Sequence, residues 1–344
     1  MNNNLMGNSL INTPLEGLNY SFAKYVEDKK NFERRHLGGN GLPDYAYKMD
    51  YEYRKKLDSM PGVYKFAKKY ASTVVPQAIH QYSTMGIQVG PNQYPEIYQM
   101  VRECAETLGI GIPKLLIVPE IDLGGGYTTD FNAVTYAVDD IEPVIIITGL
   151  MLERFSAGEI KAIIGHECGH IHNNHGIYSV IETIIANVGI SALFSIPVLA
   201  PFANLLTIGV QAALSMWSRA AEVTADRAGL ICVGDPKVAA NVDVKFLYKG
   251  TDISQSTQSE VNYEALREQM NLVLNSPHRL NEFFSSHPLS IKRAFANLDF
   301  WECETLYSWR PDLKKPGMVT YSKAVIDEKC KKYLDVVNPK GAKK

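Results

Sequence analysis

The sequence predicts an α+β fold that is mostly helical, with a small β-sheet beside one central helix. The run Val144-Ile145-Ile146-Ile147 is β-branched throughout and is followed by Gly149, which predicts a buried strand that ends in a turn. Ser156 and Glu159 then form an S-x-x-E capping box, which is typical of the start of a helix. The apolar residues of that helix recur at helical spacing, at Ile160, Ile163, Ile164 and Ile171.

Further elements are predicted on both sides of this strand and helix. Apolar residues at a helical period predict a helix over residues 95–108, and residues 115–118 are typical of a strand. Residues 127–137 predict a second strand, preceded by the glycines 124–126, which suit a flexible loop at the rim of a cleft. After Pro236, helices are predicted as far as residue 280, with a polar break at residues 252–258.

The central helix carries His166-Glu167-Cys168-Gly169-His170, which reads H-E-x-x-H. Positions four apart lie on one helix face, so the two imidazoles can bind one Zn²⁺ together. Glu167 can reach a metal-bound water and take its proton. Gly165 and Gly169 weaken a helix, and their place beside the histidines suggests that another backbone passes close by; the other interpretation is that the helix simply tolerates glycine there. The alternative is a chance motif on a helix surface.

A third protein ligand is needed for a catalytic zinc site. A metzincin would have a histidine six residues after His170, where this chain has Gly176. His172 and His175 are off the ligand face, so we interpret both as polar residues at a helix end. Glu222 and Asp226 form E-x-x-x-D on a predicted helix. Glu222 can complete a His₂Glu site, and Asp226 can accept the second ring N–H of a ligand histidine, although E-x-x-x-D alone is also common on solvated helix faces.

Taken together, these motifs resemble a family of zinc metallopeptidases that includes the heat-shock protease HtpX and the CAAX prenyl proteases. The similarity runs in order from about Pro91 to Leu298. The matching features are Asn132-Ala133, the strand with Gly149-Leu150, H-E-x-x-H with His175 five residues later, S-R-x-x-E-x-x-A-D from Ser218, and Ser286-His287-Pro288 followed by Arg293.

This resemblance implies a zincin-like fold with a gluzincin-type site, in which His166, His170 and Glu222 hold one Zn²⁺ per chain. It implies that Asn132 and Ala133 lie on the strand edge along which an extended peptide substrate binds, where free backbone groups accept any sequence. It also implies that His287 and Arg293 face the site. His287 would stabilise the oxyanion, with Arg293 orienting or assisting; the alternative for His287 is an ordinary surface histidine.

Composition places few limits on the function. The chain has 344 residues, is 46% hydrophobic, and carries a net charge of −2, which gives no reason to expect nucleic acid as a partner. Its five cysteines are widely spaced and form no C-x-x-C, which favours a reducing compartment, so we expect a cytoplasmic protein.

We predict a helical extension (residues 1–75), the metallopeptidase domain (76–300) and a C-terminal helical segment with a basic tail (301–344).

The apolar hairpin at residues 183–218 contains no Asp, Glu, Lys, Arg or His. Pro197 and Pro201 divide it into segments that fall short of the ~20 residues that span a bilayer. One interpretation is a buried or interface-forming helical hairpin. The other is a hairpin that touches or enters a membrane, which would direct the enzyme toward quality control of membrane proteins.

The function predicted from these observations is that of a zinc metalloendopeptidase, which hydrolyses peptide bonds of extended or unfolded protein segments through a metal-bound water with Glu167 as general base. A non-catalytic peptide-binding chaperone or adaptor on the same fold is the second hypothesis. A zinc hydrolase of some non-peptide bond is the third.

Overall fold

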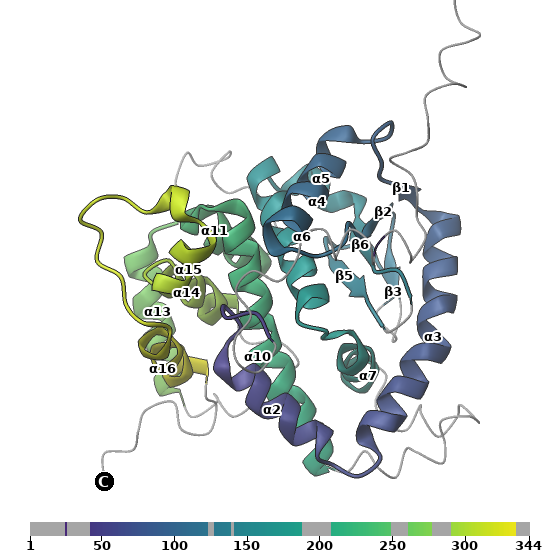
Figure 1. Cartoon of the computed structure of the whole chain (residues 1–344), viewed down its shortest axis with the longest axis horizontal. Coiled ribbons are helices and arrows are strands. Elements are labelled where there is room, and N and C mark those ends of the chain that lie inside the picture. The colour runs from purple at the N-terminus through teal and green to yellow at the C-terminus, as the bar shows by residue number, and fades with distance from the viewer. Residues whose placement is uncertain are drawn as a thin grey trace, which may run out of the picture.

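A computed structural model describes residues 25, 42–122, 127–138, 141–187, 208–248, 261–276 and 290–334. The helices are α2 (Lys48–Asp58), α3 (Val63–Met85), α4 (Pro95–Leu108), α5 (Gly149–Arg154), α6 (Ala157–His172), α7 (Gly176–Asn187), α10 (Ile208–Val233), α11 (Pro236–Leu247), α13 (Tyr263–Asn275), α14 (Ser290–Phe300), α15 (Glu304–Trp309), η3 (Pro311–Leu313) and α16 (Lys323–Leu334). The strands are β1 (Ile87–Gln88), β2 (Lys114–Val118), β3 (Ile121–Asp122), β4 (Tyr127–Thr128), β5 (Ala133–Tyr136) and β6 (Val144–Thr148). The predicted α+β fold, mostly helical with a small sheet beside α6, is confirmed (Figure 1).

The four-stranded sheet has the order β1-β2-β6-β5, so that β5 forms one of its edges. β2 and β6 run parallel, whereas β1 and β5 are antiparallel to their neighbours. The strands predicted at residues 115–118 and 144–147 are therefore confirmed as β2 and β6. Every residue of β6 is buried because both faces of the sheet are covered. Ile145 and Ile147 join the core with α4 and α6, while Val144 and Ile146 pack with Tyr82 of α3.

The single strand predicted over residues 127–137 is wrong. β4 pairs with β3 in a separate two-stranded sheet, and β5 pairs with β6. Between them, the backbone N–H of Asp130 donates to Oγ1 of Thr128 at 3.1 Å, a local turn that competes with strand pairing. Phe131 then packs against the rings of Phe155 and Phe246, which favours the bend because it buries an aromatic side chain.

The turn expected at Gly149 is also wrong. Gly149 begins the short helix α5 directly after β6. This helix buries Met151 in the main core, which a simple turn would leave exposed.

The helix α6 begins with the predicted capping box. The Ser156 hydroxyl accepts from the Glu159 N–H at 3.4 Å, and the Glu159 carboxylate accepts from the Ser156 N–H at 2.7 Å. The four predicted isoleucines of this helix are all buried. The sequence therefore identified the start of α6 and its buried face.

The close passage of another backbone past the glycines of α6 is confirmed, and the neighbour is α10. A Cβ atom added to Gly165 would lie 2.7 Å from Cβ of Cys232, and one added to Gly169 would lie 2.7 Å from Cβ of Ala228. Gly229 is equally close from the other side, because its Cβ would lie 2.7 Å from the Ala162 carbonyl oxygen. Figure 1 shows α10 between the sheet half of the molecule and the C-terminal helices. This contact brings two distant motifs together.

The predicted helices at residues 95–108 and after Pro236 are confirmed as α4, α11 and α13. Two helices, α2 and α3, occur within the predicted N-terminal extension, and α3 continues through residue 75 to Met85. The predicted C-terminal segment contains α15 and α16. The glycines 124–126 and the polar break at residues 252–258 lie outside the described residues.

The two ends of the predicted apolar hairpin are the helices α7 and α10, and its residues 188–207 lie outside the described residues. Within the described ranges, no helix combines the length and the apolar character that crossing a membrane requires.

Candidate active site

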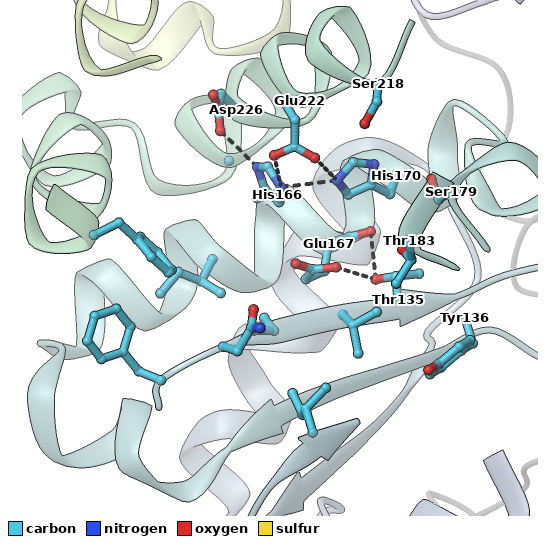
Figure 2. A pocket seen from close by; sticks show the side chains of 18 of the residues that line it. Thr135, Tyr136, His166, Glu167, His170, Ser179, Thr183, Ser218, Glu222 and Asp226 are labelled. Carbon is cyan, nitrogen blue, oxygen red and sulfur yellow. Dashed lines mark hydrogen bonds and ion pairs between the residues drawn. The ribbon is translucent and has the colours of Figure 1, made fainter. Parts of the chain in front are cut away.

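Three side chains from α6 and α10 converge at the centre of the molecule. The Nε2 atoms of His166 and His170 lie 3.1 Å apart. The Glu222 carboxylate faces both rings, with Oε2 3.7 Å from His166 Nε2 and Oε1 3.5 Å from His170 Nε2. In Figure 2 the two rings point at this carboxylate from the facing helix. The structure thus brings together the three predicted ligands, with donor atoms all within 4.8 Å of one another.

The arrangement of hydrogens at this cluster fits a metal ion. Nδ1 of His166 lies 2.9 Å from Oδ1 of Asp226, a carboxylate that only accepts. In the neutral ring the proton therefore sits on Nδ1, and the Nε2 lone pair faces His170 and Glu222. With His166 neutral, its Nε2 lone pair and the Glu222 carboxylate face the same point, which suits a cation. Two nitrogens bound tetrahedrally to zinc would lie roughly 3.3 Å apart, close to the separation seen here.

Burial and neighbouring charges set the protonation of the two histidines. Burial lowers the pKa of His166, but the hydrogen bond and charge of Asp226, with the charge of Glu222, raise it to about 9. Burial, and then the nearby charge of His166, hold the pKa of His170 well below its ordinary value. The site without a metal therefore carries its extra proton on His166, and a bound cation would replace that proton.

Glu167 lies between the histidines and the sheet. Its Oε2 accepts a hydrogen bond of 2.6 Å from the Thr135 hydroxyl of β5 (Figure 2). Burial raises the pKa of Glu167, although the charge of His166 and the Thr135 hydrogen bond oppose the shift. A carboxylate with a raised pKa beside the cluster is suited to accepting and returning a proton. The contact of Thr135 with Glu167 was not predictable from the sequence, because 32 positions separate the two residues.

Arg293 of α14 joins the carboxylates behind the cluster. Its Nε and Nη2 donate to the two Asp226 oxygens at 2.8 and 2.6 Å, and Nη1 lies 3.0 Å from Glu222 Oε2. Asp243 is also close, with Oδ1 3.3 Å from Nε. Burial disfavours the charge of Asp226, but Arg293 and then His166 hold its pKa below the usual value. The structure therefore places Arg293 against Asp226 and Glu222.

His175 lies past the end of α6 and outside the ligand cluster, as predicted, but its burial and its contact with His170 were not predicted. His175 is fully buried, and its Nδ1 lies 2.8 Å from Nδ1 of His170. The chain leaves helical geometry after His172, with Asn174 at a φ of 53°, so helical spacing no longer predicts where the His175 ring points. The ring turns back toward His170. The sequence signal that was available is the histidine five residues after H-E-x-x-H.

A cavity of about 720 Å³ borders the cluster. Its wall includes Asn132 and Ala133, the two residues predicted to contact substrate, and the exposed edge of β5. In the part of the chain that is described, no strand pairs with the outer side of β5. Three hydroxyl residues of the cavity wall lie near His170, on the side away from Asp226 (Figure 2): Ser179 and Thr183 of α7 and Ser218 of α10. Of the three predicted catalytic residues, Glu167 and Arg293 are described above, and His287 lies outside the described residues.

Comparison with known proteins assigns this chain to a family. Residues 91–301 match peptidase family M48. The chain is 27% identical over 272 residues to a plastoglobule-localized metallopeptidase 48, chloroplastic, from Arabidopsis thaliana, a match covering 75% of this chain and 72% of the relative. It is 27% identical over 262 residues to a protease HtpX homolog from Bifidobacterium longum, covering 67% and 76%. No solved structure gives a significant match.

Proposed function

This chain belongs to peptidase family M48 and is a metallopeptidase, and from that premise we propose that it is a zinc-dependent endopeptidase that cleaves extended or unfolded segments of proteins. The observation that carries the proposal is the convergence of His166, His170 and Glu222 beside the buried carboxyl of Glu167. Their donor set of two imidazoles and one carboxylate is the one used by several catalytic zinc sites.

Each side chain has a distinct role in this proposal. His166, His170 and Glu222 would hold one zinc ion per chain. When bound, zinc supplies Lewis-acid polarisation of the scissile carbonyl and lowers the pKa of a coordinated water toward ~7. Glu167 takes a proton from the attacking water and returns it to the leaving amine. Asp226 holds the His166 ring by its Nδ1–H, and Arg293 holds the Asp226 and Glu222 carboxylates in place.

The substrate is proposed to bind as an extended strand along the edge of β5. Free backbone N–H and C=O groups of an edge strand pair with a peptide of any sequence, which suits an enzyme for unfolded segments. Asn132 and Ala133 lie at the start of this edge and line the cavity. From the family resemblance, His287 is proposed to donate a hydrogen bond to the oxyanion.

The test is a zinc measurement combined with a Glu167→Gln variant. Inductively coupled plasma analysis of protein purified without chelator is expected to find about one zinc per chain. Glu167→Gln is expected to cut casein at least ~100-fold more slowly, the lower end for one general acid–base group, with zinc content unchanged. Glu153→Gln, on the exposed side of α5, is the matched control and should cut casein normally.

Two results would contradict the proposal. One is wild-type protein that holds no zinc, and the other is a Glu167→Gln variant that cleaves casein as fast as the parent. Wild-type protein that binds casein without fragmenting it would favour the non-catalytic peptide binder. A panel of non-peptide esters and amides tests the hydrolase alternative.

The location proposed from the cysteines is the cytoplasm, since all five are buried free thiols. For residues 183–218 there are two alternatives, a hairpin packed against protein and a hairpin that touches or enters a membrane. Carbonate extraction of cell membranes separates them, because a hairpin inserted in the bilayer stays in the pellet and a protein-packed hairpin is released.

A further inference from the structure

A buried carboxylate from the N-terminal helix α2 lies behind the proposed metal ligand His170. Asp50, in the first turn of α2, is 2% exposed, and its Oδ2 lies 3.0 Å from Nε2 of His175. The other ring nitrogen of His175 is the one that contacts His170 Nδ1 at 2.8 Å. Three groups thus form a continuous chain from α2 to the metal cluster. Asp50 lies outside residues 91–301, the part of the chain that matches the family.

The hydrogens of this chain can be assigned by counting donors. The Thr224 hydroxyl accepts from the Tyr47 backbone N–H at 3.1 Å. Its own hydrogen has two acceptors within reach, Asp50 Oδ2 at 2.8 Å and the Ala220 carbonyl at 3.4 Å, and the shorter contact assigns it to Asp50. Asp50 therefore acts as an acceptor, and His175 must donate to it from Nε2. A neutral ring has one N–H, so Nδ1 of His175 accepts from His170 Nδ1–H. The lone pair of His170 then resides on Nε2, which faces His166 and Glu222.

The position of Asp50 is set by several contacts around α2. The Tyr45 carbonyl accepts from Arg227 of α10 at 3.1 Å, and Arg54 donates to the Asn173 carbonyl at 2.8 Å. The Trp217 ring packs edge-on against His175, with ring centroids 5.6 Å apart. Contacts to the C-terminal end of α6 and to two positions of α10 therefore hold α2 and the His175 ring in place around the Asp50–His175 pair.

The two proposed ligand histidines are thus supported in different ways. His166 donates directly to Asp226, which lies within the family match. His170 donates to a carboxylate only through His175, and that carboxylate comes from outside the match. A carboxylate behind a ligand histidine fixes its tautomer and ring orientation and raises its basicity.

We propose that Asp50 is a positioning residue of the metal site, which acts through His175 to hold the His170 ring with Nε2 directed at the metal. This inference rests on the proposed zinc function. It assigns the N-terminal helix α2 a part in metal binding, in addition to packing.

The test compares two carboxylates of the same helix. Asp50→Asn keeps the volume and one acceptor oxygen but removes the charge, whereas Asp58→Asn removes a carboxylate that accepts from Tyr178 at 2.6 Å, away from the cluster. Zinc affinity is measured by competition with a chelating dye, and the thermal midpoint of each metal-free protein is recorded. We expect Asp50→Asn to bind zinc about tenfold more weakly or worse, the usual range for such partners, and Asp58→Asn to match wild type.

An Asp50→Asn affinity equal to wild type would overturn the inference, as would an equal loss in Asp58→Asn, since that would indicate a general effect of α2 docking. Wild-type protein that binds no zinc would instead contradict the proposed function itself, so the two failures are distinguishable.

A second measurement needs no variant and holds if Asp50→Asn fails to fold. Nitrogen-15 NMR of the histidine rings in the zinc-loaded protein reports which nitrogen carries each proton. We expect His175 to carry its proton on Nε2 and His170 on Nδ1. A His175 ring protonated on Nδ1 would overturn the inference.

Discussion

At the scale of single residues, Thr135 connects the substrate edge to the proposed general base. Its hydroxyl donates to Glu167 at 2.6 Å from β5, the strand along which we place the peptide. This hydrogen bond fixes the direction of the buried Glu167 carboxylate. The proposed substrate edge and the position of the proposed base therefore depend on the same strand.

We predict that Thr135→Val lowers kcat for peptide cleavage about tenfold. The valine has nearly the same shape but no donor, and one hydrogen bond to a charged group contributes roughly 1.5 kcal/mol. Steady-state kinetics on a fluorogenic peptide measures the effect. Thr107→Val on α4, whose hydroxyl donates only to the Glu103 carbonyl, is the control. An unchanged kcat in Thr135→Val would show that this hydroxyl does not position the base.

Arg293 places its one positive charge among three buried carboxylates, namely Asp226, Glu222 and Asp243. Burial, and then the charge of Asp226, raise the pKa of Asp243 well above its usual value. Removing the Arg293 guanidinium would therefore leave buried carboxylates without a positive partner and destabilise the folded state. We predict that Arg293→Gln lowers the free energy of unfolding of the metal-free protein by about 3 kcal/mol.

Urea denaturation of the metal-free protein measures this loss. The control is Arg102→Gln, which breaks an exposed pair with Glu106 on α4 and should cost less than about 1 kcal/mol. Equal losses in the two variants would contradict the importance of burial at Arg293.

At the scale of elements, the contact of α6 with α10 decides whether the cluster of proposed metal ligands can form. The histidines are on one helix and Glu222 on the other, so the interaxial distance sets the spacing of their donor atoms. Gly165, Gly169 and Gly229 permit that distance, because a methyl group on any of them would press into the facing helix.

We predict that Gly169→Ala destabilises the metal-free protein by about 2 kcal/mol. In an isolated helix the same change would stabilise by roughly 1 kcal/mol, so the sign itself tests the contact. The added Cβ would meet Ala228 Cβ at 2.7 Å and Ala225 Cα at 3.0 Å. Gly149→Ala is the control, since its nearest neighbour would lie 3.9 Å away. A thermal midpoint that rises in Gly169→Ala would contradict this packing.

At the scale of the whole molecule, the core encloses every thiol of the chain. Cys104, Cys168, Cys232, Cys303 and Cys330 are all buried. Burial raises the pKa of Cys168 and Cys232 well above the ordinary value, which leaves little thiolate at neutral pH. Cys168 packs in the main hydrophobic core.

We predict that none of the five thiols in the native protein reacts with iodoacetamide while an introduced exposed cysteine, Ser72→Cys, is fully modified. All five should react once guanidinium has unfolded the chain, because unfolding restores both access and an ordinary pKa. Mass spectrometry counts the modified sites. Rapid modification of any native thiol would contradict this packing.

Local features of this protein were determined by its sequence alone. The S-x-x-E box started α6 where expected, the β-branched run became the central strand, and H-E-x-x-H placed two rings on one face. These hold because helix and strand geometry fix the direction of side chains over one or two turns. The motif order also identified Glu222 and Asp226, more than 50 positions away.

Only the tertiary structure decided which distant groups complete the site. Thr135 meets Glu167 across 32 positions, and Asp50 meets His175 across 125. The backbone between such residues has no fixed geometry, so their contact depends on how whole helices and strands pack. The direction of the His175 ring was also not predictable, because His175 follows the end of α6, where helical spacing stops predicting direction.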